Sequence, residues 1–164
     1  MAKKKEKHGH KTNAIRIVEA EGIEYNMYEY DAPDGFLDGV SVARSLGQDT
    51  AQVFKTLVAV SSKNEHYVCV IPVERELNLK KAAKHFGAKK MEMMLSRNLT
   101  AVTGYIKGGC SPVGMKKLFP TAIDASAANF DTIIVSGGKV GLQMELPVEA
   151  LLRVTKGSLA DLTD

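Results

Sequence analysis

Two neighbouring stretches give the strongest β-strand signal in this chain: Val53-Phe54-Lys55-Thr56-Leu57-Val58-Ala59-Val60 and His66-Tyr67-Val68-Cys69-Val70-Ile71-Pro72-Val73. Both are rich in β-branched residues, which pack well on a pleated sheet. The five residues between them, Ser-Ser-Lys-Asn-Glu, are polar and suited to a turn. The pattern therefore predicts an antiparallel hairpin.

Shorter elements are predicted on both sides of this hairpin, with glycine or proline at several of their ends. Thr12 or Asn13 caps a first helix that stops before Gly22, and Pro147 begins the last helix, where a proline is well tolerated. In chain order we expect a helix at 13–20, a strand at 23–30, a turn at 31–35, helices at 40–46, 79–86 and 91–95, strands at 122–124, 133–135 and 140–146, and a helix at 147–153. Strands outnumber helices, and their spacing is too irregular for repeated βαβ units. The fold class is therefore α+β, with a mixed, curled sheet and peripheral helices.

Length and composition indicate one folded domain. The chain has 164 residues and a net charge of +3, to which the leader Met1–Lys11 contributes five lysines. We expect residues 1–11 to be a disordered basic leader and residues 12–164 to form the domain. A nearly neutral body does not indicate a duplex-DNA binder, and 6% aromatic residues without Trp argue against base stacking along a single strand.

Targeting, metal and disulfide signals are lacking in the sequence. There is no apolar run of membrane-spanning length and no signal-peptide pattern, so we expect a cytoplasmic protein without a membrane partner. Cys69 and Cys110 have neither metal-ligand nor disulfide spacing, and Cys69 fits a small buried hydrophobe. His8 and His10 fit a solvated tail better than a metal site, and no cofactor is indicated.

Lys55 is a cation inside an otherwise apolar strand. It fits an edge-strand lysine whose stem lies on the sheet and whose ammonium reaches water. It also fits a donor fixed in a cleft and aimed at phosphate or carbonyl oxygens, with the hydroxyl of Thr56 beside it.

Two glycine-rich segments are the other candidate site elements. Gly104-Tyr-Ile-Lys-Gly-Gly-Cys-Ser-Pro112 and Ser136-Gly-Gly-Lys-Val-Gly141 each allow the main chain to approach a ligand. The Gly108–Gly109 pair could be a plain tight turn, but Pro112 restricts Ser111 and suits a rigid loop with exposed amides. The second segment lacks P-loop context, and a hairpin turn lining a pocket is the better interpretation.

The sequence offers few residues that could act as a general acid or base. His66 and His85 are not placed as general bases, and no Ser-His-Asp arrangement stands out. Cys110 could act as a nucleophile, but no paired histidine is available to activate its thiol.

Four ordered motifs resemble the YbaK/EbsC family of bacterial aminoacyl-tRNA deacylases, from about Thr12 to Asp161. They are 54–57 (Phe-Lys-Thr-Leu), 79–84 with 87–90 (Leu-Lys-Lys-Ala-Ala-Lys and Gly-Ala-Lys-Lys), 104–112 with 114–117 (Gly-Met-Lys-Lys), and 135–139 with Gly141-Leu142. The resemblance implies a β-barrel-like mixed sheet with surrounding helices. It implies an enzyme that acts in trans to remove cysteine from mischarged Cys-tRNA(Pro), with Cys-tRNA(Cys) as a possible further substrate and prolyl-tRNA synthetase as a possible partner.

The resemblance also implies a mechanism that needs little acid–base chemistry. The cysteinyl thiol attacks its own ester carbonyl and releases the tRNA, so the protein has only to orient the substrate. Lys55 takes the catalytic role, at the terminal adenosine and phosphate or at the reacting carbonyl. The implied substrate-binding residues are Tyr30, Thr56, Gly108, Gly109, Cys110, Ser111, Pro112, Ser136, Gly137, Gly138 and Gln143.

Two positions depart from the family pattern. Gln143 stands where some members carry aspartate, and Cys110 stands where an aliphatic residue is more common. Three other functions remain open: a non-catalytic module that binds tRNA ends or a synthetase, an Ala-tRNA(Pro) hydrolase, and a thiol enzyme that uses Cys110.

Overall fold

The predicted hairpin is present as β2 (Phe54–Ser61) and β3 (His66–Pro72), which pair antiparallel with Lys55 opposite Ile71. The structure is a computed structural model and describes residues 11–32 and 38–164. The predicted leader lies outside the described residues except for Lys11, and the predicted turn at 31–35 lies mostly outside them.

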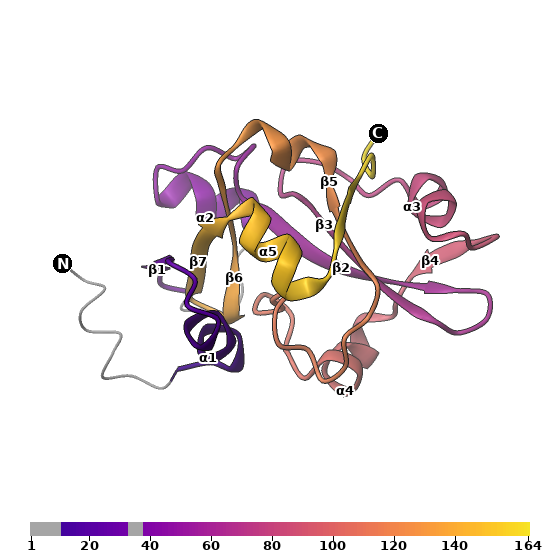
Figure 1. Cartoon of the computed structure of the whole chain (residues 1–164), viewed down its shortest axis with the longest axis horizontal. Coiled ribbons are helices and arrows are strands. Elements are labelled where there is room, and N and C mark those ends of the chain that lie inside the picture. The colour runs from indigo at the N-terminus through magenta and orange to yellow at the C-terminus, as the bar shows by residue number, and fades with distance from the viewer. Residues whose placement is uncertain (1–10, 33–37) are drawn as a thin grey trace.

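The hairpin is the centre of a five-stranded sheet in the order β4-β2-β3-β5-β8 (Figure 1). The added strands are β4 (Met91–Met93), β5 (Thr121–Asp124) and β8 (Ser158–Ala160). β2 pairs antiparallel with β3 and β4, whereas β3–β5 and β5–β8 are parallel pairs. The sheet is therefore mixed, as the sequence predicts.

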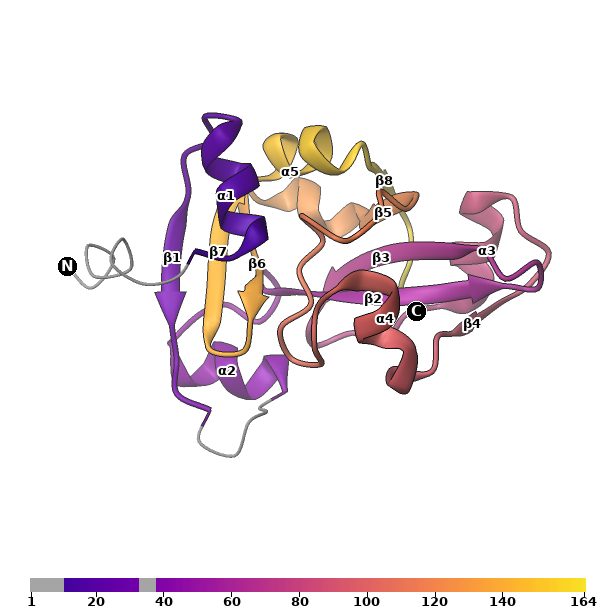
Figure 2. The same ribbon diagram turned by 90° about the horizontal axis from the view of Figure 1, so that it is seen from below.

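A second sheet contains three antiparallel strands in the order β1-β7-β6. Their bounds are β1 (Asn26–Glu29), β6 (Thr132–Lys139) and β7 (Leu142–Pro147). Figure 2 shows this sheet beside the hairpin, with β6 as its nearest strand. The register of β6 shifts between Ser136 and Lys139, which is a β-bulge in the second glycine segment.

The expected β-barrel-like closure is wrong, because the two sheets do not close on each other. A single parallel bridge, between Val53 and Ile134, joins β6 to the beginning of β2. Beyond that bridge the strands diverge, and β2 pairs on that side again only from Ala59, with β4.

The helices lie outside the sheets. They are α1 (Asn13–Ala20), α2 (Gly39–Ser45), α3 (Leu79–Phe86), α4 (Leu99–Thr103) and α5 (Val148–Thr155), with short 3₁₀ helices η2 (Ser96–Asn98) and η3 (Ala125–Asn129). The predicted caps hold: the Thr12 hydroxyl accepts from Ile15 N at 3.1 Å, and Gly87 ends α3 in the left-handed region. In the described part of the chain, no helix is long and apolar enough to cross a membrane.

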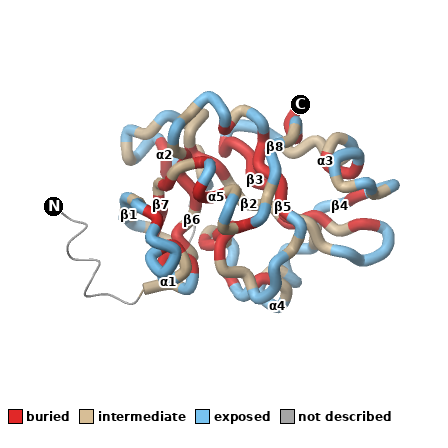
Figure 3. The backbone as a smooth tube through the Cα atoms, in the orientation of Figure 1, coloured by how far each residue is buried: buried red, intermediate tan, exposed pale blue. Residues whose placement is uncertain are grey.

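The main core lies between the two sheets and is closed by α1 and α5 (Figure 3). Its fully buried side chains include Ile15, Val70, Ile133, Met144 and Leu151. A smaller core packs α3 on the other face of the hairpin, where Cys69 is completely buried as predicted. Burying each large aliphatic side chain stabilises the fold by about 1.5–3 kcal/mol, so these two layers fix the position of β2.

Two local predictions need correction. Residues 91–95 do not form a helix but contain β4, because Val60 and Ser61 offer an unpaired edge, and pairing there outweighs the helix propensity of Met and Glu. The second glycine segment does not turn the chain at Gly137 and Gly138, which belong to β6; the turn lies at residues 140–141. The bulge absorbs the irregularity that the glycines introduce.

Candidate functional site

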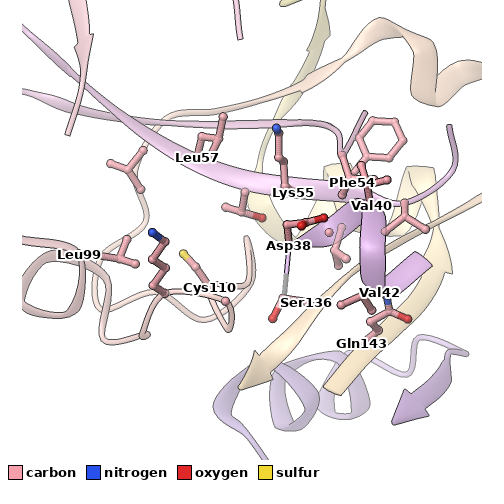
Figure 4. A pocket seen from close by; sticks show the side chains of 18 of the residues that line it. Asp38, Val40, Val42, Phe54, Lys55, Leu57, Leu99, Cys110, Ser136 and Gln143 are labelled. Atoms are coloured by element: carbon pink, nitrogen blue, oxygen red, sulfur yellow. The ribbon is translucent and has the colours of Figure 1, made fainter. Parts of the chain in front are cut away.

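A pocket of about 650 Å³ lies along the first half of β2, at the place where the two sheets diverge (Figure 4). Six consecutive residues, 53–58, line it. Successive side chains of a strand point to opposite faces, so a cavity against one face would contact every second residue. The pocket therefore borders the edge of β2 and reaches both faces of the strand.

The edge of β2 that faces away from β3 is open in its middle, because β6 and β4 each pair with only one end of it. β3 pairs with β2 along its length, with Val73 N donating to Val53 O at 2.8 Å and Ser61 N donating to Glu65 O at 2.9 Å. These bonds assign the odd-numbered residues of β2 to β3. The even-numbered residues 54, 56 and 58 direct their main-chain groups to the opposite edge.

Thr56 lies at the middle of that open stretch. Its main-chain N–H and C=O belong to no strand pair, because the bridge to β6 is at Val53 and pairing with β4 begins at Ala59. The Oγ1 atom of Thr56 is buried and has no hydrogen-bond partner among the described residues. A buried hydroxyl without a partner is costly, so this group is poised to bind a polar ligand.

Lys55 lines the pocket from the other face of β2. In Figure 4 the Lys55 and Leu57 side chains extend to one side of the strand, while Cys110 and Ser136 lie on the other side. Lys55 is half-buried and forms no ion pair with a residue that the structure describes. Lys55 therefore contributes to the pocket from the face of β2 that lies away from Cys110.

The first glycine segment reaches the pocket through Gly108 and Cys110. Gly108 has φ = +85°, a conformation that favours glycine. The other predicted members are structural neighbours: Gly109 is buried, Pro112 is buried, and the Ser111 hydroxyl accepts from Val113 N at 3.2 Å. These three residues lie outside the pocket lining.

The second glycine segment contributes Ser136 alone. Gly137 O accepts a 2.5 Å hydrogen bond from the Thr12 hydroxyl, and Gly138 N donates to Ser136 Oγ at 3.1 Å. Gln143, opposite Ser136 on β7, is buried at the pocket, and its side-chain carbonyl accepts from Gln48 Nε2 at 2.8 Å. Gln143 therefore ties β7 to the end of α2.

The pocket brings together seven of the twelve predicted site residues: Tyr30, Lys55, Thr56, Gly108, Cys110, Ser136 and Gln143. The remaining five, Gly109, Ser111, Pro112, Gly137 and Gly138, belong to the two glycine segments but do not line the pocket.

Some lining residues were not predicted from the sequence. Asp38 caps α2 and is the one carboxylate among the described residues that line the pocket; Lys107 and Leu99 line it from the α4 side. Hydrogen bonds from the Ser41 backbone and hydroxyl, opposed by some burial, lower the pKa of Asp38 and keep it ionised. The sequence shows that Asp38 can cap a helix, but it does not show that this helix end lies at the same pocket as β2.

Cys110 is a protonated thiol at neutral pH. Burial raises its pKa to about 11, and the lowering effect of a hydrogen bond from Thr103 is smaller. Neither His66 nor His85 lines the pocket, so the described histidines do not activate this thiol. Among the described residues, no group of three His, Cys, Asp or Glu side chains could hold a metal ion.

The chain resembles known proteins in sequence and in fold. Residues 38–154 match the aminoacyl-tRNA editing domain. EbsC of Enterococcus faecalis (strain ATCC 700802 / V583), named as a Cys-tRNA(Pro)/Cys-tRNA(Cys) deacylase, is 50% identical over 163 residues, which cover 99% of this chain and 98% of that protein.

Two solved structures show that the fold is shared. One is described as a trans-editing enzyme for prolyl tRNA synthetase, with 22% identity, a TM-score of 0.78, and coverage of 95% of this chain and 99% of that one. The other is the hypothetical protein APE2540, with 20% identity, a TM-score of 0.84, and coverage of 93% and 99%.

Gly109→Ala tests the contact between the two glycine segments. A Cβ at Gly109 would lie 2.7 Å from Lys139 Cα and 2.8 Å from Val140 N, both backbone atoms that cannot turn aside. We expect thermal unfolding to show a loss of about 1–3 kcal/mol, as for other overpacked sites. Gly22→Ala is the control, because nothing lies within 4 Å of a Cβ there and only its positive φ resists the change. Equal effects of the two substitutions would contradict the contact.

Proposed function

The chain belongs to the aminoacyl-tRNA editing domain family, and from this premise we propose that it removes cysteine from mischarged Cys-tRNA(Pro) in the cytoplasm. The identity of 50% with a protein named as a Cys-tRNA(Pro)/Cys-tRNA(Cys) deacylase supports this substrate. Prolyl-tRNA synthetase, which recognises the same tRNA, is the proposed partner.

The observation that carries the proposal is a pocket that can orient an ester but contains few groups that could react with it. Its ionisable lining is Tyr30, Asp38, Lys55, Lys107 and the protonated Cys110. None of the lining residues is a histidine. Such a site suits a substrate that brings its own nucleophile, as a cysteinyl ester does.

We assign the aminoacyl group to the open edge of β2. An aminoacyl ester has the N–Cα–C=O arrangement of a strand residue, so its carbonyl can accept from Thr56 N–H while its ammonium lies near Thr56 C=O and Asp38. The cysteinyl sulfur then attacks the ester carbon within the same molecule. The new S–C bond closes a thiolactone, the bond from the carbon to the ribose oxygen breaks, and that oxygen takes up the thiol proton. The donor at Thr56 stabilises charge that develops on the carbonyl oxygen.

Lys55 is assigned to the phosphate of the terminal nucleotide. It lies on the face of β2 opposite Cys110 and Ser136, so one end of the substrate can contact the lysine while the ester occupies the other face (Figure 4). Charge-assisted contacts of this kind fix the position of a flexible 3′ end.

A deacylation panel tests the function. Purified protein is mixed with labelled Cys-, Ser- and Ala-tRNA(Pro), and the remaining aminoacyl-tRNA is measured over time. We expect the cysteinyl ester to be cleaved at least about 100-fold faster than the seryl ester, because only cysteine supplies a thiol for the intramolecular attack. Equal cleavage of the seryl ester would refute the assisted mechanism, and cleavage of Ala-tRNA(Pro) alone would refute the substrate. Binding without any turnover would indicate a non-catalytic module.

Lys55→Ala tests the phosphate assignment. Loss of a charged hydrogen bond worth about 1.5–3 kcal/mol predicts a fall in kcat/KM of roughly 10- to 100-fold. Lys55→Arg should recover part of this loss because it keeps the charge. The matched control is Lys63→Ala, an exposed lysine in the β2–β3 turn, which should keep full activity. A wild-type rate in Lys55→Ala would rule the assignment out.

Cys110→Ser distinguishes a lining residue from a nucleophile. With a pKa raised to about 11, the thiol is almost entirely protonated from pH 6 to 9. It therefore supplies very little thiolate in that range, and we expect the variant to stay within about threefold of wild type, with an unchanged pH–rate profile. A loss of activity of several hundredfold would instead support a thiol enzyme.

A further inference from the structure

The charge of the folded body is distributed very unevenly, although its total is close to zero. Residues 88–118, named here the basic segment, carry six basic residues and a single acidic one, Glu92. The remaining residues of the domain, 12–87 and 119–164, carry 11 basic and 17 acidic residues. The total charge of the body is close to zero because a region of net positive charge and a region of net negative charge offset each other.

The basic segment forms one wall of the pocket and the surface around it. It contains β4, η2, α4 and the first glycine segment, and its members Lys107, Gly108 and Cys110 line the cavity. The six basic side chains are all exposed: Lys89, Lys90, Arg97, Lys107, Lys116 and Lys117. Lys90 forms an ion pair with Glu92 at 3.5 Å, and both side chains remain largely in solvent.

The positions of the basic residues follow from local contacts. Lys116 N donates to Thr103 O at 3.0 Å, and its ammonium donates to Ala101 O at 3.2 Å, which holds the Lys116–Lys117 pair against α4. Arg97 lies in η2, directly before α4. α4 reaches the open part of the hairpin through Leu99, which lines the same pocket as residues 53–58 of β2.

The same segment carries most of the exposed apolar surface. Of the five large hydrophobic side chains exposed among the described residues, four lie here: Met93, Leu95, Ile106 and Leu118. Leu95 is 53% exposed and Ile106 is 56% exposed. Exposed apolar groups between basic residues, next to a pocket, suit a ligand that presents both phosphates and flat bases.

We propose that the basic segment is the surface on which the acceptor end of the aminoacyl-tRNA docks, so that the 3′ end enters the pocket from the α4 side. Arg97, Lys116 and Lys117 bind the phosphodiester backbone, and Leu95 and Ile106 contact unpaired bases. The remaining residues of the domain carry more acidic than basic side chains, so their summed field disfavours approach of a polyanion away from the basic segment. This inference rests on the proposed function and adds the direction from which the substrate binds.

The test is the salt dependence of tRNA binding. Uncharged tRNA(Pro) is titrated against wild type and against the triple variant Arg97→Gln, Lys116→Gln, Lys117→Gln, at several salt concentrations between 50 and 200 mM. Each phosphate contact contributes about 0.7–0.9 to the slope of log K against log salt. We therefore expect the slope of the triple variant to be smaller by about 2 to 3, with an affinity at low salt weakened by more than tenfold.

A matched control removes the same charge elsewhere. Lys63→Gln, Lys80→Gln, Lys84→Gln changes three exposed lysines of the β2–β3 turn and α3. It should bind tRNA nearly as wild type does, because these residues lie outside the basic segment. Equal losses in both triple variants, or an unchanged slope in the first, would overturn the proposal. Arg97→Gln, Lys117→Gln, which keeps the Lys116–Ala101 bond, repeats the test if the first variant folds poorly.

A short substrate separates this inference from the proposed function. The cysteinyl ester of a CCA trinucleotide has too few phosphates to reach the whole segment, so the triple variant should cleave it at the wild-type rate. Loss of tRNA affinity together with normal cleavage of the short ester supports the docking surface. If wild type cleaves neither substrate, the proposed function fails, while the salt slope still decides the docking surface.

Discussion

The incomplete pairing of strand β2 is the constraint on which the rest of the structure depends. Its inner edge is paired along its length, but its outer edge is paired only at the two ends, by a bridge at Val53 and by β4 from Ala59. Hydrophobic layers on both sides hold the strand in place, so the gap persists without collapsing. The main chain of β2 that has no strand partner on this side coincides with the cavity.

The glycine segments matter because they let two chain regions meet closely behind that cavity. Gly109 lies against the backbone of Lys139, and Gly137 is bound by the Thr12 hydroxyl. The first helix, the β6–β7 hairpin and the loop after α4 are thereby tied together. Gly108, Cys110 and Ser136 then face the pocket from fixed positions.

Much of the fold could be predicted from local patterns. The hairpin, the caps at Thr12 and Gly87, and the burial of Cys69 depend on periodicity and cap chemistry that are visible in the sequence. The formation of strand β4 in place of a helix at 91–95 depends on a free partner at Val60, which no local propensity indicates. The expected barrel failed for a similar reason, since closure depends on whether two distant strands stay parallel beyond a single bridge.

The site was predictable in part for the same physical reasons. Lys55 and Thr56 stand out because a cation and a hydroxyl interrupt an apolar strand, and the structure places both at the pocket. Gly109, Ser111 and Pro112 share the motif but face the interior, because a motif identifies a loop without saying which of its residues point outward. Asp38 carries an ordinary helix-cap signature, and only the tertiary fold brings it to β2.

The short open stretch of β2 also bears on how the protein behaves in a crowded solution. Unpaired strand edges invite strands of other molecules and are a common origin of aggregation. In this fold, β6 blocks one end of the stretch and β4 blocks the other, and Met94 N already donates to Val58 O at 3.1 Å, so the open main chain is confined to the surroundings of Thr56. A foreign strand would collide with both neighbours before it formed a lasting ladder, whereas a single residue-sized guest would not. The geometry of the open stretch therefore favours a residue-sized guest over an added strand.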